Sequence, residues 1–140
     1  MVLLDTDVIS EFMKDNPAPK VARWFAAQDV NALFTCAVNK AEVEYGIAVL
    51  PAGKKKAKLA AHAATLFSRF PCLPFENLDT AHYADIRARD KTKGKPLSGD
   101  KMISDAMIAA VARRHGMTLA TGNVNHFSGV DGLAVVNPWR

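Results

Sequence analysis

Long apolar runs, repeats and low-complexity segments are absent from this sequence of 140 residues. No stretch approaches the roughly 18 apolar residues that a membrane-spanning helix requires. Asp5 interrupts the apolar start too early for a signal peptide. No Pro/Gly-rich linker divides the chain, and a chain of this length can bury a sizeable core. We therefore expect one soluble, cytoplasmic domain spanning residues 1–140.

Cysteine is scarce as well. Cys36 and Cys72 are the only two, and they form no CxxC or Cys/His cluster with the spacing of metal ligands. This argues against a disulfide scaffold and against a zinc site. We expect both side chains to be small buried hydrophobic groups in a reducing compartment.

Acidic residues are outnumbered: 18 Lys and Arg accompany 14 Asp and Glu, which gives a formal net charge of +4. A basic excess favours a polyanionic partner. Phosphate contacts at the basic runs would weaken with salt, although a solvated helix face explains such runs equally well. The sequence carries no aromatic motif of RNA recognition. The basic residues are densest at 53–58 and at Arg87, Arg89, Lys91, Lys93 and Lys95.

Short apolar strands alternate with helices along the chain. We expect strands at residues 2–4, 31–36, 118–121 and 133–139, helices at 7–14, 19–28, 39–50, 58–70, 78–90 and 104–116, and a polar loop at 91–100. This alternation predicts an α/β fold in which helices flank a mostly parallel central sheet. In such sheets, sites form at the carboxyl ends of strands. Asp5 and the segment 121–123 should therefore open onto one crevice.

Three acids, Asp5, Glu42 and Asp105, lie in otherwise apolar settings. Two ionised carboxylates about 5 Å apart repel by about 3 kcal/mol at an effective dielectric near 20. Such a cluster needs a cation or must retain a proton. Mg²⁺ or Mn²⁺ suits carboxylate oxygens and can activate a bound water. Acids and a basic surface together suggest hydrolysis of a phosphodiester.

Each acid also has a structural interpretation. Asp5 follows a strand and could simply cap the next helix, and Asp105 could open the helix after Ser104. Glu42 and Glu44 lie two residues apart on one helix and so face different directions; we expect Glu44 to be solvated, while spacing alone leaves the direction of Glu42 open.

Four segments together resemble a known family: LLDTDVIS, the Ala41–Glu42 pair in its helix, SDAMIAAVARRHGMTLATGN and the closing VVNPW. They are similar to the PIN-domain toxins of bacterial toxin–antitoxin pairs, of the VapC, FitB and StbB type. The resemblance implies a metal-dependent endoribonuclease that acts on RNA, often structured RNA such as transfer RNA. It also implies a homodimer inhibited in a hetero-oligomer by a small VapB-like antitoxin. The metal-holding acids match Asp5, Glu42 and Asp105, and a fourth catalytic polar position matches Asn123.

The sequence departs from the family pattern in four places. Asp7 stands where Asn is usual, and would add a negative charge or act behind the metal ligands. Gly122 replaces an Arg, and His126 replaces an Asp. His126 could contact a substrate phosphate. About four extra residues before the SDAMIAA segment make Asp100 a rival candidate ligand.

Two alternatives compete with a nuclease. The first is a haloacid-dehalogenase-like phosphatase, with Asp5 as nucleophile and Asp7 as general acid. Thr35 and the Gly-Asp pair at 99–100 imitate its later motifs, but that pair follows a loop and Glu42 is left without a role.

The second is a catalytically silent binding module, suggested by Gly122 and His126. It predicts that Asp5→Asn changes neither toxicity nor RNA integrity.

A partner surface is suggested by the large apolar residues of the first two helices. Phe12, Met13, Trp24 and Phe25 are denser than a small core demands. We expect some of them to receive an antitoxin segment as a helix in a groove.

Overall fold

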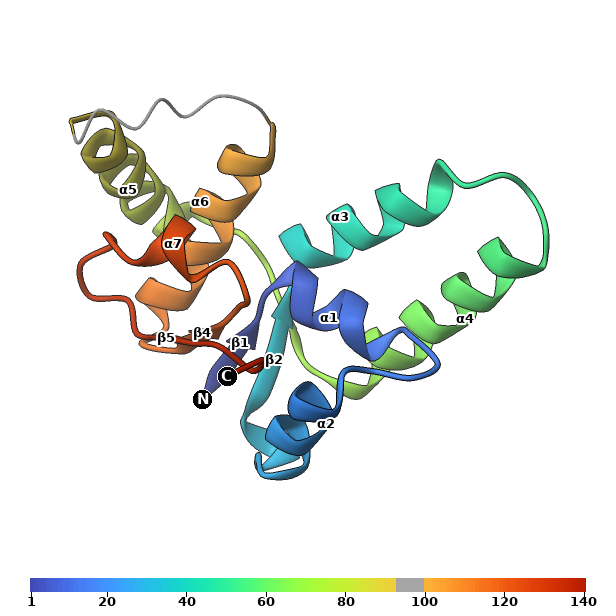
Figure 1. Ribbon diagram of the computed structural model, residues 1–140. Helices are drawn as coiled ribbons and strands as arrows, with labels where there is room; N and C mark the ends of the chain where they lie inside the picture. The colour runs from blue at the N-terminus through green and yellow to red at the C-terminus, as the bar shows by residue number, and fades with distance from the viewer. Residues whose placement is uncertain (93–99) are drawn as a thin grey trace.

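In the described part of the chain, five short parallel strands form the centre of the molecule (Figure 1). The structure is a computed structural model that describes residues 1–92 and 100–140, without the side chains of residues 91, 92, 100 and 101. The strands are β1 (Val2–Leu4), β2 (Leu33–Cys36), β3 (Cys72–Leu73), β4 (Thr118–Ala120) and β5 (Val135–Val136). The helices are α1 (Thr6–Phe12), α2 (Pro19–Ala26), α3 (Ala37–Ala48), α4 (Lys54–Arg69), α5 (Thr80–Thr92), α6 (Asp100–Arg114) and α7 (Val124–Phe127).

The strand order in the sheet is β3-β2-β1-β4-β5, so the first strand lies in the middle. β1 pairs in parallel with β2 on one side and with β4 on the other. Leu4 lies opposite Ala120 in this register, which brings Asp5 and Thr121 to the same edge. The predicted α/β fold with a parallel central sheet is confirmed.

Helices cover both faces of the sheet. Successive strand side chains point to opposite sides, and because these side chains are apolar, both faces must be buried. Leu3 and Leu119 pack with α6 and with Phe127 of α7 in one buried cluster. Leu4 and Ala120, the next residues along, pack in a second cluster with α1, α3 and α4. Both clusters exclude water from the sheet, so polar groups near it must find partners in the protein.

Some element boundaries differ from those expected. Residues 30–32 form a 3₁₀ turn before β2, and only Val135–Val136 of the predicted last strand pair with a neighbour. The sequence pattern did not predict α7 or β3. β3 has only two residues, too few to show an alternation of apolar and polar side chains. Of the loop predicted at 91–100, residues 91 and 92 belong to α5 and Asp100 belongs to α6; the rest of that prediction lies outside the described residues.

The two cysteines behave differently. Cys36 is fully buried, as predicted, and burial raises the pKa of its thiol to about 12. Cys72 lies exposed on the edge strand β3, so the prediction of a buried side chain was wrong. Both are free thiols. Within residues 1–92 and 100–140, no helix is both long and apolar enough to cross a membrane.

Candidate functional site

Asp5 lies at the carboxyl end of β1, where it is 2% exposed. Its backbone N–H donates to the carbonyl of Ala120, which ties the end of β1 to the end of β4. The amide of Thr6 donates to Asp5 Oδ1 at 2.8 Å, and the hydroxyl of Thr121 donates to Oδ2 at 2.7 Å. Asp5 is thus the N-cap of α1 through Oδ1. Its Oδ2 is bound by Thr121, the residue predicted to share a crevice with it. Capping α1 therefore does not prevent Asp5 from also belonging to a functional site.

The pKa of Asp5 is raised from 3.8 to about 7. Burial is the largest cause, because it penalises the charged form, and the negative charge of Asp7 is the next. The hydrogen bonds from Thr121 and Thr6 oppose the shift, and the charge of Asp105 adds to it. A group tuned in this way is a candidate for function and would ionise readily beside a cation.

Glu42 is half-buried on the first turns of α3 and is connected to Asp5 through Thr6. The hydroxyl of Thr6 donates to Glu42 Oε1 at 2.7 Å and accepts a hydrogen bond from the Asn39 amide at 3.0 Å. Asn39 is fully buried and its side-chain oxygen accepts the backbone N–H of Cys36. One threonine therefore binds Asp5 with its backbone and Glu42 with its side chain. Sequence reasoning missed Thr6 and Asn39, although Asn39 lies three residues before Glu42 on the same helix face.

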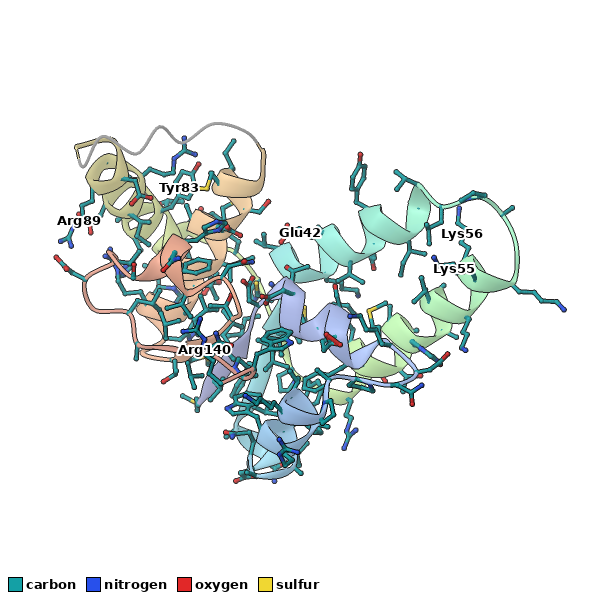
Figure 2. The ribbon with its side chains drawn as sticks, viewed as in Figure 1. Glu42, Lys55, Lys56, Tyr83, Arg89 and Arg140 are labelled. Atoms are coloured by element: carbon teal, nitrogen blue, oxygen red, sulfur yellow. The ribbon has the colours of Figure 1, made fainter. Side chains whose placement is uncertain are left out.

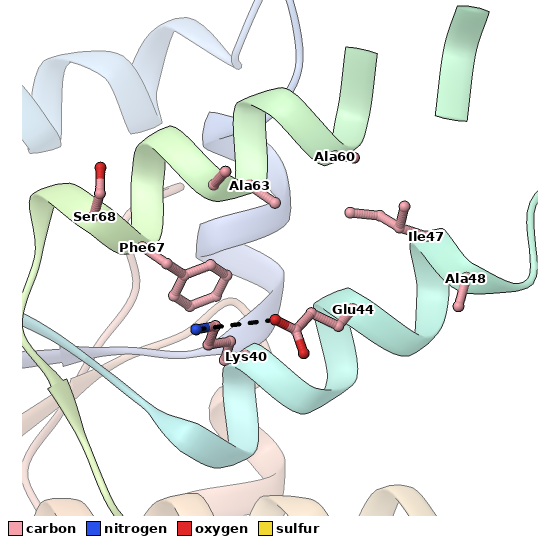
Figure 3. Close-up of a pocket in the computed structure, with 9 residues that line it drawn as sticks. Lys40, Glu44, Ile47, Ala48, Ala60, Ala63, Phe67 and Ser68 are labelled. Atoms are coloured by element: carbon pink, nitrogen blue, oxygen red, sulfur yellow. Dashed lines mark ion pairs between the residues drawn. The ribbon is translucent and has the colours of Figure 1, made fainter. Parts of the chain in front are cut away.

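Glu44 points elsewhere. It is exposed and pairs with Lys40 at 4.0 Å beside a hollow of about 560 Å³ between α3 and α4 (Figure 3). The floor of this hollow is apolar, with contributions from Ile47, Ala63 and Phe67. The prediction that Glu42 and Glu44 face different directions, with Glu44 solvated, is confirmed.

Asp105 is buried on α6, with 4% of the residue exposed. His126 of α7 lies against it, with 2.9 Å between Nδ1 and Asp105 Oδ2. His126 is one of the positions that depart from the family pattern. Its ring contacts Asp105, one of the predicted metal ligands.

Asp7 is held at the same edge of the sheet. Its Oδ1 accepts the N–H of Val8 and its Oδ2 accepts the N–H of Gly122, both at 2.8 Å. A Cβ on Gly122 would lie 3.0 Å from Asp7 Oδ2 and 3.0 Å from the ring of Trp139. The absence of a side chain at position 122 therefore allows Asp7 and Trp139 to approach this backbone closely.

Asn123 enters the site through its backbone. Its N–H donates to the Thr121 hydroxyl at 3.0 Å, the same hydroxyl that binds Asp5. Its side chain is half-buried just before α7 and makes no capping hydrogen bond. A catalytic role for the Asn123 side chain stays a prediction.

The donors at this edge suit a hard divalent cation in chemistry, since they are carboxylate oxygens in a setting that penalises negative charge. Within the described part of the chain, however, no three acidic, histidine or cysteine side chains stand close enough to hold a metal as placed. Asp5, Asp7 and Asp105 interact electrostatically, and Glu42 joins through Thr6. The ligand set Asp5, Glu42 and Asp105 therefore stays a prediction.

The rival features receive less support. Thr35, needed by the phosphatase alternative, is buried within β2, and its hydroxyl donates to the carbonyl of Pro71. Asp100 begins α6, but its side chain lies outside the described residues, as does the Gly99 that precedes it.

Several described residues of the basic runs lie away from Glu42 or have partners within the protein. Figure 2 shows Lys55 and Lys56 at the opposite end of the α3–α4 pair from Glu42. Lys56 donates to the carbonyls of Ala48 and Leu50 and so completes the end of α3. Arg89 pairs with Asp85 and Asp131. Positions 93 and 95 and the side chain of Lys91 lie outside the described residues.

A hollow of about 330 Å³ lies between α1, α2 and α4, in the region where a partner surface is predicted. Phe12 and Phe25 line it, with ring centroids 4.6 Å apart, together with Phe70 and the charged Arg69. The other two residues expected there are Met13 and Trp24. Met13 is buried in the core, and Trp24 is half-buried and packs against the same core cluster.

The family model described as "PIN domain" matches residues 2–133 of this chain. The chain is 36% identical over 144 residues to VapC ribonuclease Y4jK of Sinorhizobium fredii. It is 37% identical over 145 residues to toxin FitB of Neisseria gonorrhoeae. In both comparisons the match covers 100% of this chain and 99% of the relative.

Solved structures agree with these relatives. The structure of FitAcB from Neisseria gonorrhoeae superimposes with a TM-score of 0.88 at 36% identity, covering 100% of this chain and 99% of that one. A structure of FitAB bound to an IR36 DNA fragment gives a TM-score of 0.89 at 37% identity, covering 100% of this chain and 96% of that one. With a family match over nearly its whole length and full-length relatives of this similarity, the chain belongs to the PIN-domain family.

Proposed function

We propose that this chain is a Mg²⁺- or Mn²⁺-dependent endoribonuclease and the toxin of a toxin–antitoxin pair, acting in the cytoplasm. The observation that carries the proposal is the buried Asp5, which interacts electrostatically with Asp7 and with Asp105 of α6 and is linked to Glu42 by Thr6. Relatives named VapC ribonuclease and toxin FitB, matched along their full length, support both the activity and the class of system.

Asp5, Glu42 and Asp105 would hold the cation, which supplies activation of a water molecule and neutralisation of charge at the phosphorus. Thr121 and the Thr6 amide orient the two oxygens of Asp5, while the Thr6 hydroxyl orients Glu42. The surrounding apolar cores hold these donors rigidly, which favours a fixed geometry of the reacting groups.

For the antitoxin, we place the binding segment in the hollow between α1, α2 and α4. Its walls combine aromatic side chains with Lys14 and Arg69, so an apolar segment with acidic flanks fits it best. The names of the FitAB and FitAcB structures support a protein partner for this chain. The homodimer and the toxin–antitoxin hetero-oligomer belong to the same proposal.

The test is cleavage of total cellular RNA by the purified chain without any partner. Reactions contain Mg²⁺, Mn²⁺ or a chelator, and Asp5→Asn and Asp105→Asn proteins run beside the wild type. The exposed Asp15→Asn serves as a matched control, because it removes a carboxylate outside the site. Fragments that need the metal and vanish in the two site variants, but not in the control, support the proposal; cleavage that persists in chelator contradicts it.

A further inference from the structure

His126 makes a contact with Asp105 that the proposed chemistry does not yet use. The distance between Nδ1 and Asp105 Oδ2 is 2.9 Å, and the Asp105 side chain is 6% exposed against 38% for His126. An ionised carboxylate can only accept hydrogen bonds, so the ring donates its Nδ1–H. One oxygen of Asp105 is therefore engaged by a neighbour 21 positions further along the chain.

A side-chain donor also binds each of the other two proposed metal ligands. A hydroxyl from Thr121 engages Asp5 Oδ2, and a hydroxyl from Thr6 engages Glu42 Oε1. Around Asp105, most neighbouring side chains are apolar: Ile86, Met102, Ala106, Phe127 and Val130 line a small cavity with it, to which Asp90 adds a second carboxylate. In these surroundings the imidazole N–H takes the place that the threonine hydroxyls take at the other two acids.

We propose that His126 is a positioning residue: its Nδ1–H fixes Asp105 Oδ2, which leaves Oδ1 as the oxygen available to a divalent cation. The inference rests on the proposed metal-dependent function. The position of the ring is set by α7, where the next residue, Phe127, is 2% exposed in the core. Hydrogen-bond partners behind metal ligands typically change metal affinity by about 10- to 100-fold when removed.

Two amide variants separate this role from a direct contact with substrate. The side-chain nitrogen of Asn lies about where Nδ1 of histidine lies, whereas that of Gln lies nearer to Nε2. The two ring nitrogens face different directions, so Nε2 does not serve Asp105 while Nδ1 does. His126→Asn should therefore restore what His126→Ala removes, and His126→Gln should not.

The experiment measures Mn²⁺ binding to the purified full-length chain by isothermal titration calorimetry, with circular dichroism to verify folding. We expect His126→Ala and His126→Gln to bind Mn²⁺ about tenfold more weakly than the wild type, and His126→Asn to stay within about threefold of it. RNA cleavage by His126→Ala should recover when Mn²⁺ is raised by about the same factor, because affinity rather than chemistry is impaired.

Unchanged Mn²⁺ affinity in a folded His126→Ala protein would overturn the inference and leave the proposed function intact. Rescue by Gln instead of Asn would also overturn it, in favour of a contact through Nε2. A wild-type chain that neither binds Mn²⁺ nor cleaves RNA would overturn both proposals together.

Discussion

Asp5→Asn is expected to stabilise the metal-free protein while it removes the response to metal. Because the pKa of Asp5 is raised from 3.8 to about 7, its ionised form costs the folded state about 4 kcal/mol at pH 8. Asparagine carries no charge and keeps an oxygen for the Thr6 amide. It places an amide nitrogen opposite the Thr121 hydroxyl, at a cost of about 1–2 kcal/mol. The net gain is about 2–3 kcal/mol at pH 8.

The pH dependence has a defined sign. The folded chain binds the Asp5 proton more tightly than the unfolded chain does, so the stability from this group is present below pH 3.8 and is lost as the pH rises to about 7. Below that window the wild type should be more stable than Asp5→Asn, because its neutral carboxyl keeps both hydrogen bonds. The two stabilities should cross near pH 5, by the same balance of about 4 against 1–2 kcal/mol.

Urea unfolding at pH 4 to 8, in chelator and in saturating Mn²⁺, measures both effects. Mn²⁺ should stabilise the wild type by mass action and leave Asp5→Asn nearly unchanged. Asp15→Asn is the control, since Asp15 is exposed and pairs with Lys58, and it should show no gain that grows with pH. The reasoning is refuted if Asp5→Asn is the less stable protein at pH 8 without metal, or if Mn²⁺ stabilises it as much as the wild type.

Three further predictions concern the neighbours of Asp5. Gly122→Ala should destabilise by about 1–3 kcal/mol in thermal unfolding, because its Cβ would lie 3.0 Å from Asp7 Oδ2. Gly46→Ala, with no atom within 4 Å, should instead stabilise its helix by about 0.5–1 kcal/mol, and equal signs would contradict the packing argument. Thr6→Val should weaken Mn²⁺ binding about tenfold by removing the donor to Glu42, with Thr6→Ser restoring it; unchanged calorimetric affinity would exclude that role. Asp7→Asn should lower the pKa of the adjacent buried carboxyl, visible in a carbon NMR titration, and an unmoved midpoint would argue against the charge of Asp7 as a cause.

The sheet edge could be predicted from sequence because it depends on topology alone. An apolar strand that ends at Asp5 and another that ends before Thr121 must meet if the strands are parallel neighbours, and they do. The helix that carries Asp105 was recognised from its apolar pattern. These features need only the direction of the chain and the period of its apolar residues.

What could not be predicted depends on side-chain direction. The spacing around Glu42 left its orientation open, and only the position of α1 against α3 brings the Thr6 hydroxyl to it. Lys56 belongs to a basic run typical of nucleic-acid contacts, but its ammonium group donates to carbonyls at the end of α3. Cys72 was assigned to the core because free cysteine is usually buried, yet a two-residue edge strand leaves it exposed.

The positions that depart from the family pattern are connected in space, and their connections argue against a catalytically silent module. Asp7 receives the Gly122 amide, where a Cβ would already crowd both Asp7 and Trp139, and His126 supplies a donor to Asp105. These three departures, Asp7, Gly122 and His126, thus each supply or contact an acid at the site, whereas the fourth, around Asp100, is not among them. An ionised Asp5 near neutral pH costs about 4 kcal/mol, a large share of the 5–15 kcal/mol by which domains of this kind are stable. A module that only binds a partner would gain stability by replacing that carboxylate, so its presence is best explained by a charge that the chemistry uses.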